Sequence, residues 1–317
     1  MNVAQSVPYL SDATLAKLNI TPAQVADLIE QLIRDRAHQK VWSAPKAAIS
    51  LPDGRYAMST MAIADDPPYL ALKSLLLNPR NPSAGEPLMN ALIILQDSET
   101  GRPAAILDGN WITTMRTAAL SVVAARRMAR PESRVIAFIG SGLQARAHLL
   151  ALAEIFPLAE VRILGRGQAN IDALHALAAE RGMAVHLATD PKDVMAGADL
   201  IVSSITREHD RAPFINATHA APGTFAALVD LAQPWQPNTL NTFDHIIIDD
   251  KDQEATMKTP MVAANLVAGD LADLVLDQVN AATTATNRTA FIFRGFALGD
   301  FALASLAHRI ATASAVA

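Results

Sequence analysis

The spacing of apolar residues near the start of the chain predicts a helix. From Thr21 to about Gln39, apolar residues recur every three or four positions, as they do on the buried face of a surface helix. The run Thr21-Pro22-Ala23-Gln24 has the pattern of a capping box with proline at the first helical position. The residues expected on the apolar face are Val25, Leu28, Ile29, Leu32 and Ile33.

Several apolar runs separated by turn residues follow this helix. Pro52-Asp53-Gly54 between two such runs predicts a hairpin. Because strands joined by short turns pair side by side in opposite directions, the pattern predicts an antiparallel sheet. The expected strands are 46–51, 55–61, 69–77, 91–96 and 103–107, and a helix is expected from about Asn110 to Met128.

From Arg134 onward strands and helices alternate, which is typical of a parallel, doubly wound sheet. Asp190 before Pro191 is a natural cap for a short helix. The segment 250–287 has no clear periodicity. The expected strands are 135–139, 161–164, 184–188, 200–205, 224–229, 246–248 and 291–293, and the expected longer helices are 143–155, 171–179 and 300–313.

The stretch from Val135 to Ala145 has the form of a strand, a tight glycine turn and a helix. Gly140 allows the turn, and Gly142 has no side chain to keep the backbone away from a pyrophosphate. Ala145 lets the helix pack close to the strand, and the free N–H groups of a helix N-terminus attract phosphate. The alternative is a glycine turn that binds no ligand. Because the strand and the helix are both in place, we favour dinucleotide binding.

Composition and charge narrow the class of protein. A chain of 317 residues suits two domains, and a net charge of −5 offers no basic surface for nucleic acid. The absence of cysteine excludes disulfides, thiolate catalysis and cysteine-ligated zinc, and we expect no metal site. No apolar stretch reaches the roughly 18 residues of a membrane span, and the first residues do not have the pattern of a signal peptide. We therefore expect a cytoplasmic α/β enzyme.

Three motifs in a fixed order carry a resemblance to a known family. They are Arg116-Thr117-Ala118-Ala119, Gly140-Ser141-Gly142-Leu143-Gln144-Ala145 and Gly295-Phe296-Ala297-Leu298-Gly299-Asp300. With these motifs the chain resembles the ornithine cyclodeaminase/mu-crystallin family over nearly its whole length. The resemblance implies a Rossmann dinucleotide-binding domain at 118–293, inserted in a substrate-binding and dimerisation domain at 1–117 with 294–317. It also implies a homodimer through the antiparallel sheets, and we find no obvious layer in the sequence that would cover that sheet.

The resemblance assigns substrate contacts to three basic residues. Arg116 matches the arginine that binds the α-carboxylate, and a planar guanidinium suits bidentate carboxylate binding. Lys73 lies in a very apolar strand, where a charge is costly unless it is paired or functional, and it matches a lysine near the substrate that could donate a proton. Lys46 stands where many members have an arginine. The alternative for Arg116 is an arginine on the surface of a helix, and for Lys73 it is a strand residue that faces solvent. For Lys46 it is an exposed lysine on an edge strand.

Three further polar residues were weighed as catalytic or cofactor-binding groups. Asp230 ends a strand and matches a catalytic aspartate only if a gap is allowed, so its alternative role is to cap a turn. Thr206 matches a threonine near the cofactor ribose. His148 is interpreted as a residue on the surface of a helix.

The expected cofactor is NAD(H), with NADP(H) as the alternative. After the strand 161–164 the chain has Gly165-Arg166-Gly167, without the acid that would bind the ribose hydroxyls of NAD. Arg166 stands where NADP-using relatives have an arginine, but no second base follows it. The residues expected to bind the cofactor are Arg116, Gly140, Gly142, Leu143, Gln144, Arg166, Thr206 and Gly295.

The members of the family share hydride transfer between nicotinamide and the Cα of an amino or imino acid, so the resemblance implies an imino-acid reductase. Ornithine cyclodeaminase is the first alternative, disfavoured because Tyr56–Met61 has no acid, and a non-catalytic binder is the second. Arg294 adds a cation that the α-carboxylate does not need. It therefore favours a dicarboxylic imine such as iminosuccinate, unless Arg294 turns outward and pairs with a surface carboxylate.

Overall fold

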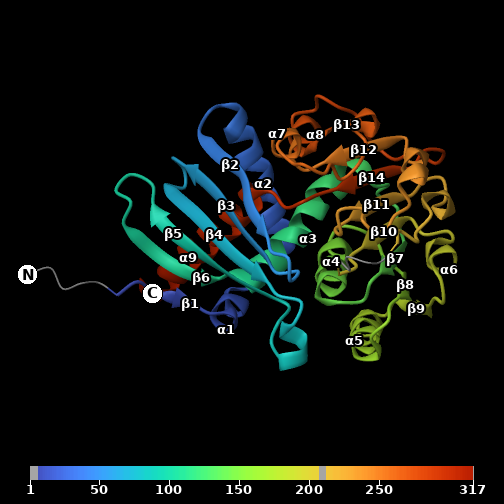
Figure 1. Cartoon of the computed structure of the whole chain (residues 1–317), viewed down its shortest axis with the longest axis horizontal. Helices are drawn as coiled ribbons and strands as arrows, with labels where there is room; N and C mark the ends of the chain where they lie inside the picture. Colours follow the sequence, from blue (N-terminus) through green and yellow to red (C-terminus); the bar gives the residue numbers. More distant parts are fainter. Residues whose placement is uncertain (1–5, 207–211, 317) are drawn as a thin grey trace, which may run out of the picture. The chain divides into compact units, whose positions relative to one another are not determined.

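The computed structural model describes residues 6–206 and 212–316, and the chain divides into two compact units (Figure 1). Unit 1 comprises Met1–Arg116 and Phe296–Ala317, and unit 2 comprises Thr117–Gly295. Unit 1 is therefore built from both ends of the chain. No helix among the described residues is long and apolar enough to cross a membrane.

The sheet of unit 1 has six strands in the order β1-β6-β5-β4-β3-β2. Strands β2 to β6 are antiparallel, as the short turns predicted. An additional strand, β1, pairs with β6 in parallel at one edge, and it was not predicted because a strand of two residues has no readable pattern. The strands are β1 (Tyr9–Leu10), β2 (Val41–Ser50), β3 (Tyr56–Ala64), β4 (Tyr69–Leu77), β5 (Met89–Asp97) and β6 (Pro103–Asp108).

Two helices cover one face of this sheet. Helix α2 (Pro22–Ala37) packs against β2 and against α9 (Ala297–Val316), and α9 packs on β2, β3, β4 and β5. The predicted capping box of α2 is confirmed, since Thr21 and Gln24 each accept a hydrogen bond from the other's backbone N–H. The expectation that the sheet has no covering layer is wrong for this face, because the last helix of the chain folds back onto it. Shorter elements are α1 (Asp12–Leu15), η1 (Ala16–Leu18) and η2 (Asn81–Ala84).

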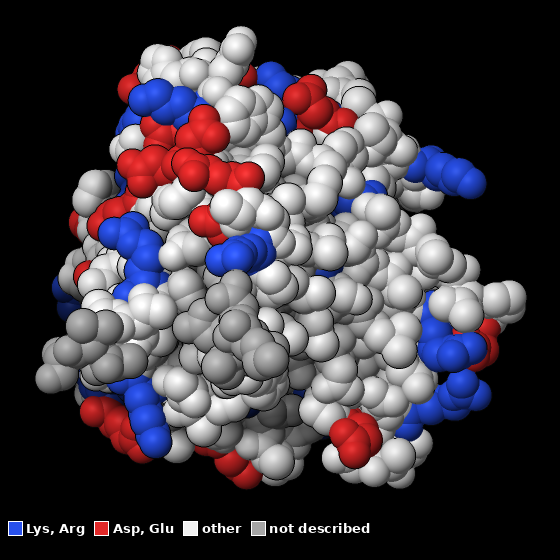
Figure 2. All heavy atoms as spheres, turned by 90° about the vertical axis from the view of Figure 1, so that its left-hand side faces the viewer, with Lys and Arg blue, Asp and Glu red and all other residues white. Residues whose placement is uncertain are grey.

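The other face of the sheet exposes apolar side chains. Met61, Leu76 and Leu92 are each more than two-fifths exposed, although alternate residues of the same strands are buried. Trp42 and Ile49 of β2 are exposed as well. Figure 2 shows a view in which most Lys, Arg, Asp and Glu side chains lie toward the edges and a broad area without them lies between.

Unit 2 holds an eight-stranded sheet in the order β13-β12-β14-β11-β10-β7-β8-β9, and all of its pairings are parallel. The predicted parallel α/β architecture is therefore confirmed. The strands are β7 (Val135–Ile139), β8 (Glu160–Leu164), β9 (Ala184–Leu187), β10 (Leu200–Ser203), β11 (Phe225–Leu228), β12 (His245–Ile248), β13 (Val267–Asp270) and β14 (Thr289–Ile292). The helices are α3 (Gly109–Met128), which begins in unit 1, α4 (Leu143–Ala153), α5 (Gln168–Ala179), α6 (Pro191–Met195), α7 (Lys251–Ala255) and α8 (Leu271–Val275), with η3 (Ala217–His219), η4 (Pro237–Thr242) and η5 (Ala264–Leu266).

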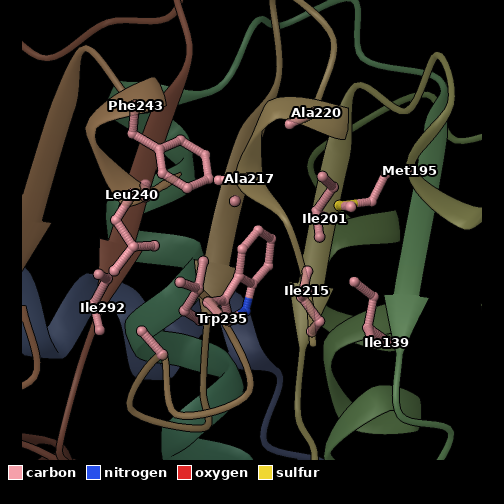
Figure 3. Packing of buried hydrophobic residues seen from close by; sticks show 14 of the residues in the cluster. Ile139, Met195, Ile201, Ile215, Ala217, Ala220, Trp235, Leu240, Phe243 and Ile292 are labelled. Atoms are coloured by element: carbon pink, nitrogen blue, oxygen red, sulfur yellow. The ribbon is translucent and has the colours of Figure 1, made fainter. Parts of the chain in front are cut away.

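A large apolar cluster lies under the middle strands of this sheet. Trp235 is fully buried at its centre, with Phe243 and Leu240 on one side and Ile215 on the other (Figure 3). Its indole N–H donates to Ser203 Oγ at 3.1 Å. The loop that follows β11 is therefore held to the end of β10 by packing and by a buried hydrogen bond, which fixes the surroundings of Asp230.

Candidate functional site

Unit 1 brings four polar side chains together on the helix-covered face of its sheet. Along β4, Ala71, Lys73 and Leu75 are buried, so strand alternation turns Lys73 away from the exposed face. Thr60 of β3 stands directly opposite Lys73 in the strand register. Arg116 comes from α3, and Asp300 lies in the first turn of α9.

Asp300 is the centre of this cluster. Its Oδ1 lies 3.1 Å from Lys73 Nζ, which donates a hydrogen bond, and 3.0 Å from Arg116 Nε. Its Oδ2 accepts a hydrogen bond from Thr60 Oγ1 at 3.0 Å. All four residues are at most 5% exposed. One carboxylate therefore links two buried cations in a place almost closed to water.

Burial and neighbouring charge change the ionisation of both partners. Burial lowers the pKa of Lys73 to about 7; the charges of Arg116 and Lys46 act in the same direction, and Asp300 opposes them. Burial alone would raise the pKa of Asp300, but the charges of Arg116 and Lys73 outweigh it and hold this pKa below its usual value. The cluster thus has a firmly ionised carboxylate and a lysine that can exchange its proton near neutral pH.

The guanidinium of Arg116 is left incompletely satisfied. Its Nε lies close to Asp300, but the geometry of that contact is an ion pair without a hydrogen bond. Within the described residues, the buried Nε and Nη1 atoms of Arg116 have no hydrogen-bond acceptor. Buried polar atoms without partners are costly, and a substrate carboxylate would supply the missing acceptors.

Two members of the cluster were not singled out from the sequence. Asp300 closes the motif Gly295–Asp300 that carried the family resemblance, and its acidic side chain at the start of an apolar helix was the available signal. Thr60 stands in the segment Tyr56–Met61, which was searched for an acid and found to have none. Lys46 is half-buried on β2, where the pairing with β3 is irregular between Ala44 and Ala47, and it influences the pKa of Lys73.

The glycine turn in unit 2 has the geometry that a dinucleotide requires. Gly140 has a φ of +100°, and a Cβ there would lie 2.8 Å from the carbonyl oxygen of Ser204. A Cβ on Gly142 would meet no atom within 4 Å, so the space beside its backbone is open. Gly142 is the N-cap residue of α4, and Leu143 and Gln144 follow in its first turn. These residues fit a pyrophosphate held by backbone N–H groups at a helix N-terminus.

The remaining residues expected at the cofactor also lie in unit 2. Arg166 and Thr206 are exposed in loops that follow the parallel strands β8 and β10. Gly295 is buried, with a φ of +107°, and its N–H donates to Asp249 Oδ2 at 2.8 Å.

Asp230 follows the carboxyl end of β11 in the same sheet and is buried. Its Oδ2 accepts hydrogen bonds from Ser203 Oγ at 2.5 Å and from the backbone N–H of Ile205 at 3.1 Å. Its Oδ1 is buried and has no hydrogen-bond donor in the part of the chain that the structure describes. Burial raises the pKa of Asp230 to about 6 against these hydrogen bonds. The carboxyl group of Asp230 is therefore fixed by hydrogen bonds from the end of β10 and the residues just after it.

One expectation about side-chain surroundings needs correction, and a second side chain has a charged partner. His148 is fully buried, not on the surface of its helix: Nε2 lies 2.9 Å from Ser121 Oγ and Nδ1 lies 2.8 Å from the carbonyl oxygen of Gln144. Arg294 is paired inside unit 2, with Nε 2.5 Å and Nη2 3.2 Å from the two carboxylate oxygens of Glu254. Glu254 therefore balances the charge of Arg294, and the role of Arg294 in binding a second substrate carboxylate stays a prediction.

Comparison with known proteins identifies proteins of similar sequence and solved structures of similar fold. The protein RB0419 of Rhizobium meliloti is 34% identical over 68% of this chain and 65% of its own length, so the chain spans about two thirds of that relative. Delta(1)-pyrroline-2-carboxylate reductase of Bacillus thuringiensis is 23% identical over 82% of this chain and 83% of that protein.

Solved structures share the fold over almost the whole chain. Delta(1)-pyrroline-2-carboxylate reductase of Thermococcus litoralis, in complex with NADH and L-proline, has a TM-score of 0.88 at 23% identity and 98% coverage of both chains. An archaeal alanine dehydrogenase dimer with bound NAD has a TM-score of 0.85 at 23% identity and 97% coverage of both. The iminosuccinate reductase of Paracoccus denitrificans with NAD+ has a TM-score of 0.82 at 22% identity and 98% coverage of both.

A family model confirms the resemblance that the three motifs carried. It matches residues 10–313, which include all of unit 2, most of unit 1 and every residue of the Lys73, Arg116 and Asp300 cluster. The chain belongs to the ornithine cyclodeaminase/mu-crystallin family.

Proposed function

We propose that this protein reduces the C=N bond of an α-imino acid to the corresponding amino acid with NADH. The observation that carries the proposal is the buried cluster of unit 1. There, Nε and Nη1 of Arg116 have no acceptor among the described residues and lie beside a lysine whose pKa is about 7. A carboxylate to be bound and a proton to be delivered are the two needs of an imino acid that accepts a hydride.

Each group of the cluster has a role in this reaction. Arg116 binds the α-carboxylate of the substrate, and Lys46 adds positive charge beside it. The bound nicotinamide supplies a hydride to the imine carbon. Lys73 supplies the proton that the nitrogen gains, so the C=N double bond becomes an amine, NADH becomes NAD+, and a neutral lysine remains to be reprotonated from water.

Asp230 is the second candidate for the proton donor. Its pKa of about 6 also lies near neutrality, and its Oδ1 is not engaged by a described residue. We favour Lys73, because it shares a cluster with the arginine that would bind the carboxylate. The pH dependence of kcat/KM in Lys73→Met and in Asp230→Asn separates the two candidates. The variant that lacks the true donor should lose the fall in activity that follows the donor's deprotonation.

The imino acid that we favour is cyclic and has one carboxylate, like Delta(1)-pyrroline-2-carboxylate. The relatives that act on this compound support the choice. A dicarboxylic imine such as iminosuccinate stays the second candidate, supported by the fold of the iminosuccinate reductase. Arg294 lends it no support, since its guanidinium is paired with Glu254.

NADH is proposed as the cofactor, with NADPH as the alternative. Three of the solved relatives contain NADH, NAD or NAD+. The open space at Gly142 and the turn at Gly140 fit the pyrophosphate that both dinucleotides share. Arg166 would favour a 2′-phosphate, so the Arg166→Ala variant should lose more affinity for NADPH than for NADH.

We also propose that the protein is a homodimer through the exposed face of the unit 1 sheet. The apolar side chains on that face, Met61, Leu76 and Leu92 among them, support this assembly. The archaeal alanine dehydrogenase of the same fold is a dimer.

The test is oxidation of NADH or NADPH, followed by absorbance, with Delta(1)-pyrroline-2-carboxylate, iminosuccinate and imines formed from 2-oxo acids and ammonia. Oxidation with at least one imine supports the proposal, and the ratio of kcat/KM values decides between cyclic and dicarboxylic substrates. Release of ammonia from ornithine without imine reduction would replace it with the cyclodeaminase. Dinucleotide binding without either reaction would favour the non-catalytic binder.

A further inference from the structure

Asp300 divides its two oxygens between different tasks. Oδ1 faces both cations of the cluster, with Lys73 Nζ at 3.1 Å and Arg116 Nε at 3.0 Å. Oδ2 accepts the hydroxyl proton of Thr60 at 3.0 Å, from the strand that pairs with β4 at Lys73. The carboxylate is thus held from three elements of unit 1, and it cannot turn without breaking a buried contact.

We propose that Asp300 is a positioning residue of the imine-reducing site, which fixes the Lys73 ammonium for proton transfer while Arg116 keeps hydrogen-bonding capacity for the substrate carboxylate. This proposal rests on the proposed function and names a residue that acts through Lys73 and not on the substrate itself. Thr60 assists Asp300 in this role, since its hydroxyl sets the orientation of the Asp300 carboxylate.

The charges around Lys73 show why an anion is needed at this position. The groups that act on Lys73 from the neighbouring elements are Arg116 of α3, Lys46 of β2 and Asp300 of α9. Two of these three are cations, and both favour the neutral amine. Asp300 is the only group among them that favours the ammonium, so its removal would leave an amine with no proton to give at neutral pH.

The geometry also separates Asp300 from the binding of the substrate. Arg116 meets Asp300 by an ion pair through Nε, whereas its Nη1 is buried and has no acceptor among the described residues. Loss of the carboxylate would leave the positive charge of Arg116 in place, since only the Lys73 ammonium depends on Asp300 for its proton. Substrate affinity should therefore hold or rise when Asp300 is neutralised, although proton transfer is lost.

The test compares Asp300→Asn with the wild type and with Glu99→Gln, which makes the same change to an exposed hairpin carboxylate of unit 1. For Asp300→Asn, kcat at about pH 8 should fall by about tenfold for each unit by which the pKa of Lys73 drops, because the fraction of Lys73 that is protonated there falls by that factor. The alkaline limb of the pH profile should move down by about one unit or more, so the defect shrinks in acid. KM should change by less than about threefold or fall, since ground-state binding is retained. Glu99→Gln should match the wild type in all three.

Thr60→Val provides a second variant that keeps every charge of the cluster, in case Asp300→Asn does not fold. It removes one hydrogen bond, so kcat should fall by about threefold to tenfold at an unchanged KM. An unchanged kcat in Thr60→Val would overturn the orienting role. Activity of Asp300→Asn lost equally at every pH would make Asp300 a proton donor itself, and a rise in KM with no pH shift would make it a purely structural residue. Either result overturns the proposal.

A measurement without turnover separates this inference from the proposed function. The ionisation of Lys73 can be followed by NMR in protein with ¹⁵N-labelled lysine, and Lys73→Met assigns its signal. A lower pKa of Lys73 in Asp300→Asn than in the wild type supports the positioning role even if no imine is reduced. An unchanged pKa overturns it even if the enzyme is a reductase.

Discussion

Burial acts on two aspartates of this protein with opposite results. Asp300 is buried between Lys73 and Arg116, and these cations lower its pKa although burial alone would raise it. Asp230 is buried beside hydroxyl and backbone donors of the described residues, and burial raises its pKa to about 6. The two carboxylates should therefore contribute to stability with opposite signs.

Amide substitutions test this difference. The raised pKa of Asp230 means that folding loses stability as pH rises from about 4 to about 6, so Asp230→Asn should unfold at the same temperature as the wild type near pH 4 and at a higher one near pH 8. Asp300→Asn should lower the unfolding temperature near pH 8, because it leaves the buried guanidinium of Arg116 without its anion, at a cost of about 3 kcal/mol or more. Thermal unfolding followed by circular dichroism measures both. Destabilisation of equal size in the two variants would contradict the assignment.

The planar guanidinium of Arg116 should contribute more to substrate binding than its positive charge alone. Arg116→Ala should reduce transition-state stabilisation, as measured by kcat/KM, by about 2–5 kcal/mol, since a buried charge-assisted contact to the carboxylate is lost. Arg116→Lys should recover only part, because an ammonium cannot make the planar bidentate contact. Steady-state kinetics with the preferred imine measures this, and wild-type turnover in both variants would place the carboxylate site elsewhere.

The pH dependence should report Lys73. In the free enzyme its pKa is about 7, so kcat/KM should fall as pH rises through that value and the ammonium loses its proton. The limb in kcat should lie higher, because a bound carboxylate favours the ammonium. Lys73→Met is the control, since any limb that it retains belongs to the substrate or to another group. A profile that is flat to alkaline pH would exclude Lys73 as the acid.

For single residues, the sequence identifies the polar side chains of the site better than it identifies the residues that contact them. Lys73 could be selected because a charge in an apolar strand is conspicuous. Asp300 was missed as its partner, because the pair is 227 positions apart in the chain. His148 was misplaced for the same reason: its apolar surroundings in α4 include Ser121 of another helix, which only the fold brings near.

The strand, turn and helix from β7 to α4 use their two glycines differently. At Gly140 the positive φ and the nearby Ser204 carbonyl oxygen make any side chain costly to the fold itself. At Gly142 the backbone is extended, with φ of −74°, and the space around it is open. Folding therefore does not require the second glycine, as expected for a position that a ligand approaches.

Gly142→Val should accordingly separate binding from stability. The variant should unfold within a few degrees of the wild type, yet its affinity for NADH should fall by at least about tenfold, because a branched side chain would occupy the approach of the pyrophosphate. Fluorescence titration of NADH and thermal unfolding are the two measurements. Gly140→Val is the comparison, and it should lose stability as well. Unchanged NADH affinity in Gly142→Val would contradict the dinucleotide site.

Elements with a regular period were predictable, and short ones were not. The strand 69–77 and the strand 135–139 occur with the predicted bounds, because each is a continuous apolar run between turn residues. Segment 250–287 contains α7, η5, β13 and α8, each of three to five residues, too short for a period to show. The last helix begins at Ala297 and not Asp300, since apolar residues precede the acid.

The exposed face of the unit 1 sheet is the feature that sets the expected assembly. Met61→Glu and Leu92→Glu each place a charge among its apolar side chains, at positions that are 42% exposed. If the face is buried between two copies, either variant should convert a dimer to monomers at micromolar concentration, because an unpaired charge would be desolvated. Sedimentation velocity measures this, with Leu187→Glu, at an exposed strand of unit 2, as the control. A monomeric wild type would contradict the proposed homodimer.

Because unit 1 closes with the last segment of the chain, the order of synthesis matters for its chemistry. Lys73 and Arg116 leave the ribosome well before Asp300, and at bacterial-type elongation rates of about 5–20 residues per second the interval is roughly 10–40 s. Most of that interval is spent on unit 2, which is complete in sequence at Gly295, just before α9 and the counter-ion of the two inward cations are made. A chain truncated after unit 2 should thus bind its dinucleotide but not hold an imino acid, because catalytic competence depends on the final helix.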